Sequence, residues 1–144
     1  MQLTPEQQQV IDRAVDSAEP TAGLRLIGEG SYRDVYALGN GLVLKACRRD
    51  DATSRRHNIM EFLLSRQLPK LTAHVFWCNG LYLIQEQVRK IRPNELFADN
   101  CIQEQYARLR YHFVDAAKLN NVGIVKRDGE TRLVMADCGS GLRA

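Results

Sequence analysis

Two glycines separated by one residue, Gly28 and Gly30, lie between two short runs that are typical of β-strands. The second run ends at the sequence Gly39-Asn40-Gly41, a strong turn signal, and a third apolar run follows that turn directly. The sequence therefore predicts a three-stranded antiparallel meander, with strands at 24–27, 34–38 and 42–47.

The position of the two glycines between strands decides which kind of phosphate site they indicate. Before a helix, a Gly-x-Gly sequence indicates a dinucleotide site, whereas between two antiparallel strands it is typical of a loop that covers phosphates. Glycine suits such a loop because the missing Cβ lets the backbone approach phosphate oxygens. Lys45 in the third strand favours this interpretation. The alternative is a simple hairpin turn, in which glycine is common.

Three helices are predicted from capping signals and apolar spacing. Thr4 and Pro5 mark the start of the first, over residues 5–18. The second follows a polar stretch at 48–56, and the third covers residues 94–114. The apolar face of the second helix is expected to pack on the sheet and is formed by four residues at helical spacing, namely Ile59, Met60, Leu63 and Leu64.

Two further hairpins complete the pattern. The first pairs 74–78 with 81–88 around Asn79-Gly80, a dipeptide expected to form a type I′ turn. The second pairs 122–125 with 132–136. The order is then helix, three strands, helix, two strands, helix, two strands, which predicts an α+β fold with antiparallel pairing.

The bulk composition indicates one ordinary globular domain. The chain has 144 residues, of which 44% are hydrophobic and 26% charged, and a formal net charge of +3. A nucleic-acid partner is not expected, because its recognition usually needs more strongly clustered cations. Only the positive net charge therefore supports a role as a nucleic-acid-binding accessory protein.

The cysteines and the apolar runs indicate in which cellular compartment the protein is expected. The four cysteines form no Cys-x-x-Cys pair, so neither a zinc site nor a disulfide framework is expected. The first ten residues lack the apolar core of a signal peptide, and no run is long enough to span a membrane. We expect a cytoplasmic protein, in host cytoplasm if it is phage-encoded.

Residues 27–36 (IGEGSYRDVY) and 43–45 (VLK) together resemble the protein-kinase-like superfamily, and in particular its compact bacterial and bacteriophage members. The resemblance implies that the loop with Gly28, Gly30 and Ser31 covers the phosphates of ATP. Arg33 replaces the third glycine of the family pattern. It either supplies charge at the phosphates or forms a salt bridge elsewhere.

The same resemblance assigns three further positions around the nucleotide. Lys45 would contact the phosphates and pair with Glu61 on the following helix. Residues 83–88 resemble the strand that leads into the hinge, where backbone groups from Glu86 to Val88 would meet an adenine. An ordinary buried strand is the alternative for that segment.

Residues 112–124 resemble the catalytic loop, and Asp137-Cys138-Gly139 resembles the Asp-Phe-Gly metal-binding tripeptide. In this resemblance Asp115 accepts the proton of a substrate hydroxyl and Lys118 neutralises phosphate. Asparagine and Asp137 hold Mg²⁺.

Two registers of this loop remain open. In the family, the spacing between the catalytic base and the metal-binding asparagine favours Asp115 as the base and Asn120 as the asparagine. The start of the next strand at Val122 favours Asn121 instead, and in that register the base position falls on Ala116.

The resemblance implies a single kinase-like domain over 1–144, with an N-terminal helix at 1–20, a small lobe at 24–90 and a reduced large lobe at 94–144. A truncated lobe, an irregular catalytic loop and Cys138 in place of phenylalanine favour a nucleotide-binding pseudokinase or accessory protein that binds a protein partner. The alternative is an active minimal ATP-dependent phosphotransferase. Exposed apolar surface on the reduced lobe would favour a homodimer.

Overall fold

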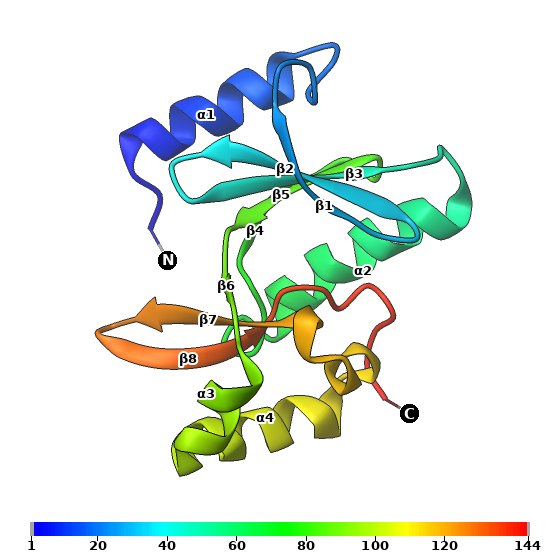
Figure 1. Cartoon of the computed structure of the whole chain (residues 1–144). Coiled ribbons are helices and arrows are strands. Elements are labelled where there is room, and N and C mark those ends of the chain that lie inside the picture. Colours follow the sequence, from blue (N-terminus) through cyan, green and yellow to red (C-terminus); the bar gives the residue numbers. More distant parts are fainter. Residues whose placement is uncertain (1, 144) are drawn as a thin grey trace.

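The computed structural model describes residues 2–143 and contains two antiparallel sheets, one in each half of the molecule (Figure 1). The larger sheet has the strand order β1-β2-β3-β5-β4 and the smaller sheet the order β6-β7-β8. The strands of the larger sheet are β1 (Arg25–Glu29), β2 (Arg33–Gly39), β3 (Leu42–Cys47), β4 (Val75–Cys78) and β5 (Tyr82–Glu86). Those of the smaller sheet are β6 (Arg89–Lys90), β7 (Val122–Arg127) and β8 (Glu130–Met135).

Helix α1 (Pro5–Asp16) covers one face of the larger sheet (Figure 1). It starts with a capping box between Thr4 and Gln7, which satisfies backbone N–H groups at the helix end. Ile11 packs against Leu42 and Leu44, the β3 side chains that point to this face. Because side chains alternate along a strand, Lys45 points to the opposite face, where the cleft described below lies.

Helix α2 (Ala52–Gln67) corrects two predictions. It begins within the stretch expected to precede it, because the Asp51 carboxylate caps it by accepting from Ser54 N at 2.8 Å. The expected apolar face is also wrong in part, since Leu64 is buried while Ile59 and Leu63 are exposed. The buried face of the helix is polar instead and is formed by Ser54, Asn58, Glu61 and Ser65.

This polar face is stable because its groups have partners on fixed backbone. Asn58 donates to Gly80 O at 2.8 Å, and the Ser65 hydroxyl accepts from Val75 N at 3.0 Å. A buried polar group that is hydrogen-bonded avoids the desolvation penalty that an unpaired group would suffer. Apolar spacing alone could not indicate this face, because the partners lie on strand β4 and the turn that follows it.

The turn between β4 and β5 also differs from the predicted type I′. That turn type requires positive φ at both central residues, but only Gly80 has it, at 93°. The Asn79 side chain accepts from Tyr82 N at 2.8 Å, and Asn79 N donates to Tyr82 O at 3.0 Å. These two bonds close a loop over residues 79–82, whose conformation differs from a type I′ turn.

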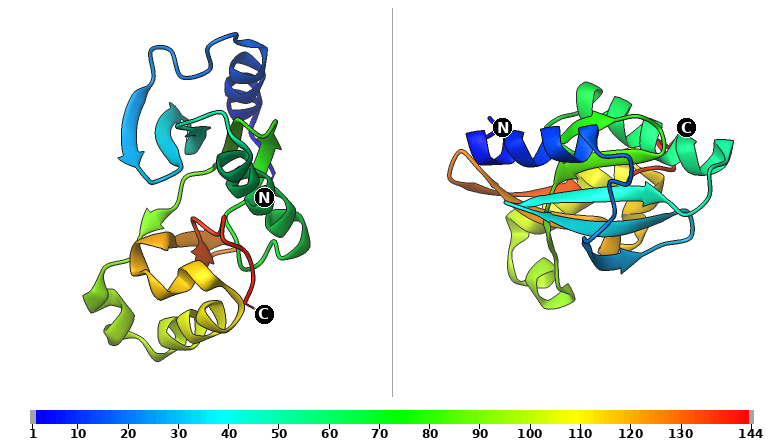
Figure 2. Two further views of the ribbon diagram at one scale, coloured as in Figure 1. Left: turned by 90° about the vertical axis from the view of Figure 1, so that its right-hand side faces the viewer. Right: turned by 90° about the horizontal axis from the view of Figure 1, so that it is seen from above.

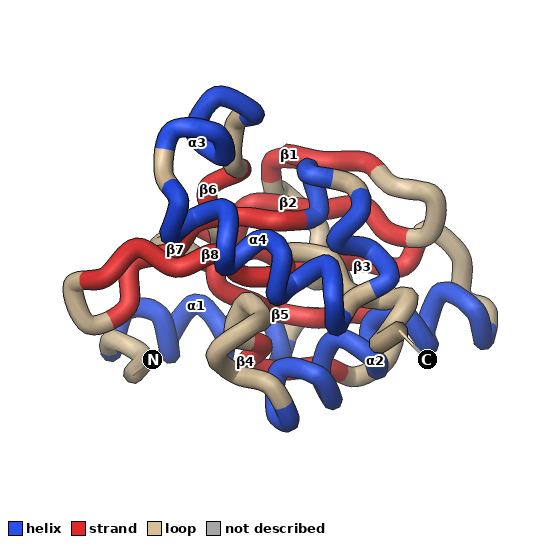
Figure 3. Tube along the Cα trace, turned by 90° about the horizontal axis from the view of Figure 1, so that it is seen from below, coloured by secondary structure: helices blue, strands red, loops and turns tan. Residues whose placement is uncertain are grey.

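Below the smaller sheet, the single helix predicted over 94–114 is two helices, α3 (Pro93–Ala98) and α4 (Asn100–His112) (Figure 3). The chain breaks at Asp99, whose carboxylate caps α4 by accepting from Cys101 N at 2.8 Å. Two short 3-10 helices, η1 (Val114–Ala117) and η2 (Leu119–Asn121), then lead into β7. Leu109 and Phe113 are fully buried in the core of this half.

The two halves are joined by backbone pairing as well as by the chain itself. Met135 N in β8 donates to Leu71 O at 2.8 Å, and Ala73 N donates to Met135 O at 2.9 Å. Leu64 of α2 packs into the core of the second half, so α2 lies between the two sheets (Figure 2). The predicted fold class, α+β with an antiparallel sheet plus a helix, is confirmed. No helix within 2–143 has the length and apolar character needed to cross a membrane.

The orientation of α2 can be tested with two neighbouring leucines. Leu64→Ala removes a side chain that is 2% exposed and should lower the free energy of unfolding by about 2–4 kcal/mol. Leu63→Ala, on a side chain that is 46% exposed, should change it by less than about 1 kcal/mol. Urea denaturation followed by circular dichroism measures both. Equal losses would contradict the orientation.

Candidate functional site

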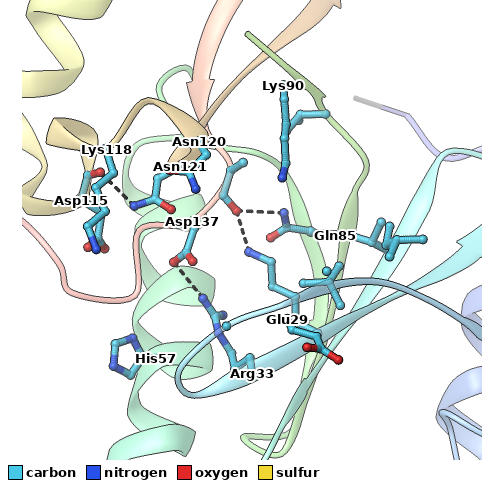
Figure 4. A pocket seen from close by; sticks show the side chains of 18 of the residues that line it. Glu29, Arg33, His57, Gln85, Lys90, Asp115, Lys118, Asn120, Asn121 and Asp137 are labelled. Carbon is cyan, nitrogen blue, oxygen red and sulfur yellow. Dashed lines mark hydrogen bonds and ion pairs between the residues drawn. The ribbon is translucent and has the colours of Figure 1, made fainter. Parts of the chain in front are cut away.

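A cleft of about 730 Å³ lies between the two sheets and is lined by the glycine loop, by β3 and β5, and by the loops around η1, η2 and the end of β8. Figure 4 shows side chains from both halves of the molecule pointing into it. The sequence-predicted site residues that line it are Gly28, Gly30, Ser31, Arg33, Lys45, Val88, Asp115, Lys118, Asn120, Asn121 and Asp137.

Glu61 lies directly behind the cleft and holds two cations at once. Lys45 Nζ lies 3.0 Å from Glu61 Oε2, which is the ion pair expected from the sequence. Arg33 binds the same carboxylate with both terminal nitrogens, at 2.6 Å and 2.8 Å. Cys138 N donates to Glu61 Oε1 at 3.0 Å. All three charged side chains are at least nine-tenths buried.

The pKa shifts in this cluster keep the groups ionised. Burial alone would raise the pKa of Glu61, but the charges of Arg33 and Lys45 and their hydrogen bonds outweigh it and hold that pKa well below its usual range. Burial would lower the pKa of Arg33, but the Glu61 carboxylate outweighs this and raises it. Glu61 and Arg33 are therefore both charged throughout the neutral pH range.

Arg33 forms the salt bridge that was one of its two sequence-based alternatives. Besides Glu61, its Nη1 donates to Asn58 Oδ1 at 3.0 Å and its Nη2 donates to Asp137 Oδ1 at 2.9 Å (Figure 4). Each terminal nitrogen carries two hydrogens, so the four bonds use all four. Arg33 thus connects the base of the glycine loop to the Asp137 loop.

Lys45 is also fully engaged. Its ammonium group has three hydrogens, and its three acceptors are the two Glu61 oxygens and Ala136 O, the last at 2.6 Å. Gln85 donates to the same Ala136 carbonyl at 3.1 Å. For Lys45 to contact a phosphate directly, it would have to release one of these acceptors.

The catalytic-loop segment presents Asp115, and not Ala116, to the cleft. Ala116 is fully buried, whereas Asp115 lines the cleft and accepts from Ser140 N through Oδ2 at 2.9 Å. Asn121 immediately precedes β7, and its side-chain nitrogen donates to Asp115 O at 3.0 Å. Asp115 and Asn121 therefore face the same cleft. Asn120 also lines it.

Glu86 does not line this cleft. Its side chain points to the other side of β5, where it accepts from His74 N at 2.9 Å and from Arg127 Nη2 at 2.5 Å. Strand alternation explains the difference, because Gln85, the neighbouring residue, points into the cleft. Gln85 was not predicted as a site residue, and in the structure it pairs with Val43 of β3, another lining residue.

His57 is a further lining residue that the sequence did not indicate. The His57 ring stacks on Tyr32 of the glycine loop, with ring centroids 4.3 Å apart. A Cβ on Gly139 would lie 2.9 Å from the His57 Cβ, so only glycine fits there. The contact of His57 with both loops depends on tertiary packing, and no spacing in the sequence signals it.

A divalent cation on Asp137 does not fit this arrangement. Asp137 Oδ1 already accepts from Arg33, and a dication there would face the guanidinium cation at contact range. Of the side chains in residues 2–143, no group of three or more from His, Cys, Asp and Glu is placed to hold a metal ion. Asp137 N donates to Asn121 O at 3.2 Å, and the Asp137 side chain pairs with Arg33.

No protein-family model and no curated protein matches this chain. Among solved structures, the chain is similar to the ternary complex of APH(2″)-IIa with streptomycin and ATP. The similarity has a TM-score of 0.43 and 20% sequence identity, over 77% of this chain and 37% of that chain. The chain thus spans well under half the length of that protein, and a match at this level does not bear on ligand or activity.

The Glu61 cluster predicts an acid-dependent loss of stability. A carboxyl group whose folded pKa is lowered stabilises the fold fully above its unfolded pKa, which for glutamate is about 4.3, and loses this contribution as the pH falls toward the folded value. Glu61→Gln leaves Arg33 and Lys45 buried without their counter-ion. It should therefore lower the free energy of unfolding at pH 7 by about 3–5 kcal/mol.

Denaturant titrations between pH 7 and pH 3 measure both effects. The variant should lose stability less steeply than the wild type below about pH 4.3, because its residue 61 cannot titrate. Glu104→Gln removes an exposed carboxylate and should stay within about 0.5 kcal/mol of wild type. A Glu61→Gln variant as stable as this control would contradict the structural importance of the cluster.

Proposed function

We propose that the cleft binds a nucleotide, ATP first among them, and that the protein is a kinase-fold nucleotide-binding protein that acts without phosphoryl transfer. One observation supports this above the others: a glycine loop, a buried lysine–glutamate pair and the Asp115 and Asp137 loops surround one cleft of about 730 Å³. That volume is within the usual range of small-molecule sites, about 300–1,000 Å³.

The charges in the cleft favour an anionic ligand. Five cationic side chains line it against three carboxylates, and Glu61 behind the lining adds a fourth. Glu95, also outside the lining, pairs with Arg89 at 2.8 Å and balances the count, so that within residues 2–143 the lining cations in no ion pair are Lys90 and Lys118. The cations are Arg33, Lys45, Arg89, Lys90 and Lys118, and the lining carboxylates are Glu29, Asp115 and Asp137.

The non-catalytic role rests on two groups whose hydrogen bonds are already taken. Lys45 has no free ammonium hydrogen, and Asp137 is paired with Arg33. Both would need to change partners before they could serve a transferring phosphoryl group. A protein partner, a homodimer, a cytoplasmic location and a bacteriophage origin belong to this proposal on the basis of the sequence alone.

An ATP-dependent phosphotransferase is the second candidate, and the position of Asp115 favours it. The carboxylate lines the cleft beside Lys118 and is held by Ser140 N. In this function Asp115 would accept the proton of a protein or small-molecule hydroxyl that attacks the γ-phosphorus.

Nucleotide binding is tested by titrating the purified protein with ATP and following the heat released. Wild type should show saturable binding. Lys45→Ala should weaken it at least about tenfold, because the variant leaves Glu61 with less positive charge around it. Lys70→Ala, an exposed lysine outside the cleft, serves as the matched control and should stay within about twofold of wild type. An absence of saturable binding would contradict the proposed function.

Catalysis is tested separately by incubating the protein with radiolabelled ATP and measuring released phosphate and labelled protein. The non-catalytic proposal expects no turnover above a blank without protein. Turnover that Asp115→Ala abolishes would contradict it and support the phosphotransferase.

A further inference from the structure

Arg33 lies at the edge of the cleft, at the end of the glycine loop. It begins β2 directly after the glycine loop, and its carbonyl oxygen accepts from Gly30 N at 2.8 Å. A Cβ on Gly30 would lie only 3.1 Å from that oxygen, so the loop closes tightly on Arg33. The residue is therefore anchored by its backbone at the base of the loop that would cover a bound phosphate.

Its side chain is a permanent and immobilised cation. The guanidinium group does not lose its proton in proteins, and only 6% of the residue is exposed. Its acceptors Glu61 and Asp137 lie 28 and 104 positions along the chain. Since all four terminal hydrogens are engaged, the group has one orientation, and it holds Asp137 at 2.9 Å.

A divalent cation could replace Arg33 at Asp137 only at high cost. Mg²⁺ requires carboxylate oxygens at about 2.0–2.1 Å in near-octahedral geometry, and an ion on Oδ1 would compete with Arg33 Nη2 and Gly139 N, which both donate to this oxygen. If Arg33 moved away, Glu61 would lose its bidentate partner while it remained 2% exposed.

We infer that Arg33 does at Asp137 what a divalent ion would otherwise do: it cancels the carboxylate charge, so that the cleft holds the phosphates of a nucleotide without a divalent metal ion. The nucleotide in this inference rests on the proposed function, whereas the exclusion of the metal from Asp137 does not. Lys118 and Lys90 supply the direct phosphate contacts, because Arg33 itself has no terminal hydrogen left to donate and Arg89 is paired with Glu95.

The inference is tested by measuring ATP affinity in EDTA and in excess Mg²⁺. Wild type should bind with affinities that agree within about threefold. Arg33→Gln should bind at least about tenfold more weakly in EDTA and recover affinity in Mg²⁺, because Asp137 is then an unpaired carboxylate. Arg25→Gln, an exposed arginine on β1, should behave as wild type. A wild-type affinity that falls tenfold or more in EDTA would overturn the inference.

A second measurement needs no nucleotide. Mn²⁺ is titrated into the protein alone and the free ion is followed by electron paramagnetic resonance. Wild type should bind no Mn²⁺ at Asp137, so its titration should match that of Asp137→Asn. Wild-type binding that Asp137→Asn removes would overturn the inference.

The two measurements separate the inference from the proposed function. If wild type binds no ATP in either buffer, the proposed function fails while the Mn²⁺ titration still decides whether Arg33 excludes the metal. If Arg33→Gln does not fold, as judged by circular dichroism, the comparison of wild type in EDTA and Mg²⁺ and the Mn²⁺ titration still give the answer.

Discussion

The buried carboxylate of Glu61 is the interaction on which most of the tertiary structure depends. Five hydrogen bonds reach it, from Arg33, Lys45 and the backbone of Cys138. Those donors belong to β2, β3 and the segment after β8, so one side chain of α2 holds both sheets and the last loop in register. A buried charge is tolerated only when paired and hydrogen-bonded, and this requirement fixes the positions of its partners.

The same requirement shapes the cleft. Arg33 and Lys45 carry two positive charges, and Glu61 and Asp137 carry two negative ones, so the cluster is neutral as a unit. The hydrogen bonds of these side chains go mainly to one another and to Ala136 O. The cleft therefore has a rigid, preorganised wall. The field that a ligand meets is set by the charges around its rim, among them Lys118, Lys90 and Asp115.

The two faces of α2 show how strongly tertiary contacts can override hydrophobic spacing. Leu63 and Ile59 are exposed, while Asn58 and Ser54 are fully buried on the opposite side. In isolation the helix would be expected to bury its leucines. In the folded chain the inward face must instead satisfy Arg33 and the carbonyl of Gly80, because both are buried polar groups.

The sequence by itself determined the local elements. The Thr4 cap, the turn at Gly39-Asn40-Gly41, the strand runs and the Lys45–Glu61 pair were predictable, because each depends on residues close together in the chain or on a motif with a fixed order. Only the tertiary structure decided that Arg33 binds Glu61 and Asp137, that Asp115 shares the cleft with Asn121, and that Glu86 faces away from it. These outcomes depend on hydrogen-bond directions between segments as much as 104 residues apart, and no periodicity or spacing along the chain encodes such directions.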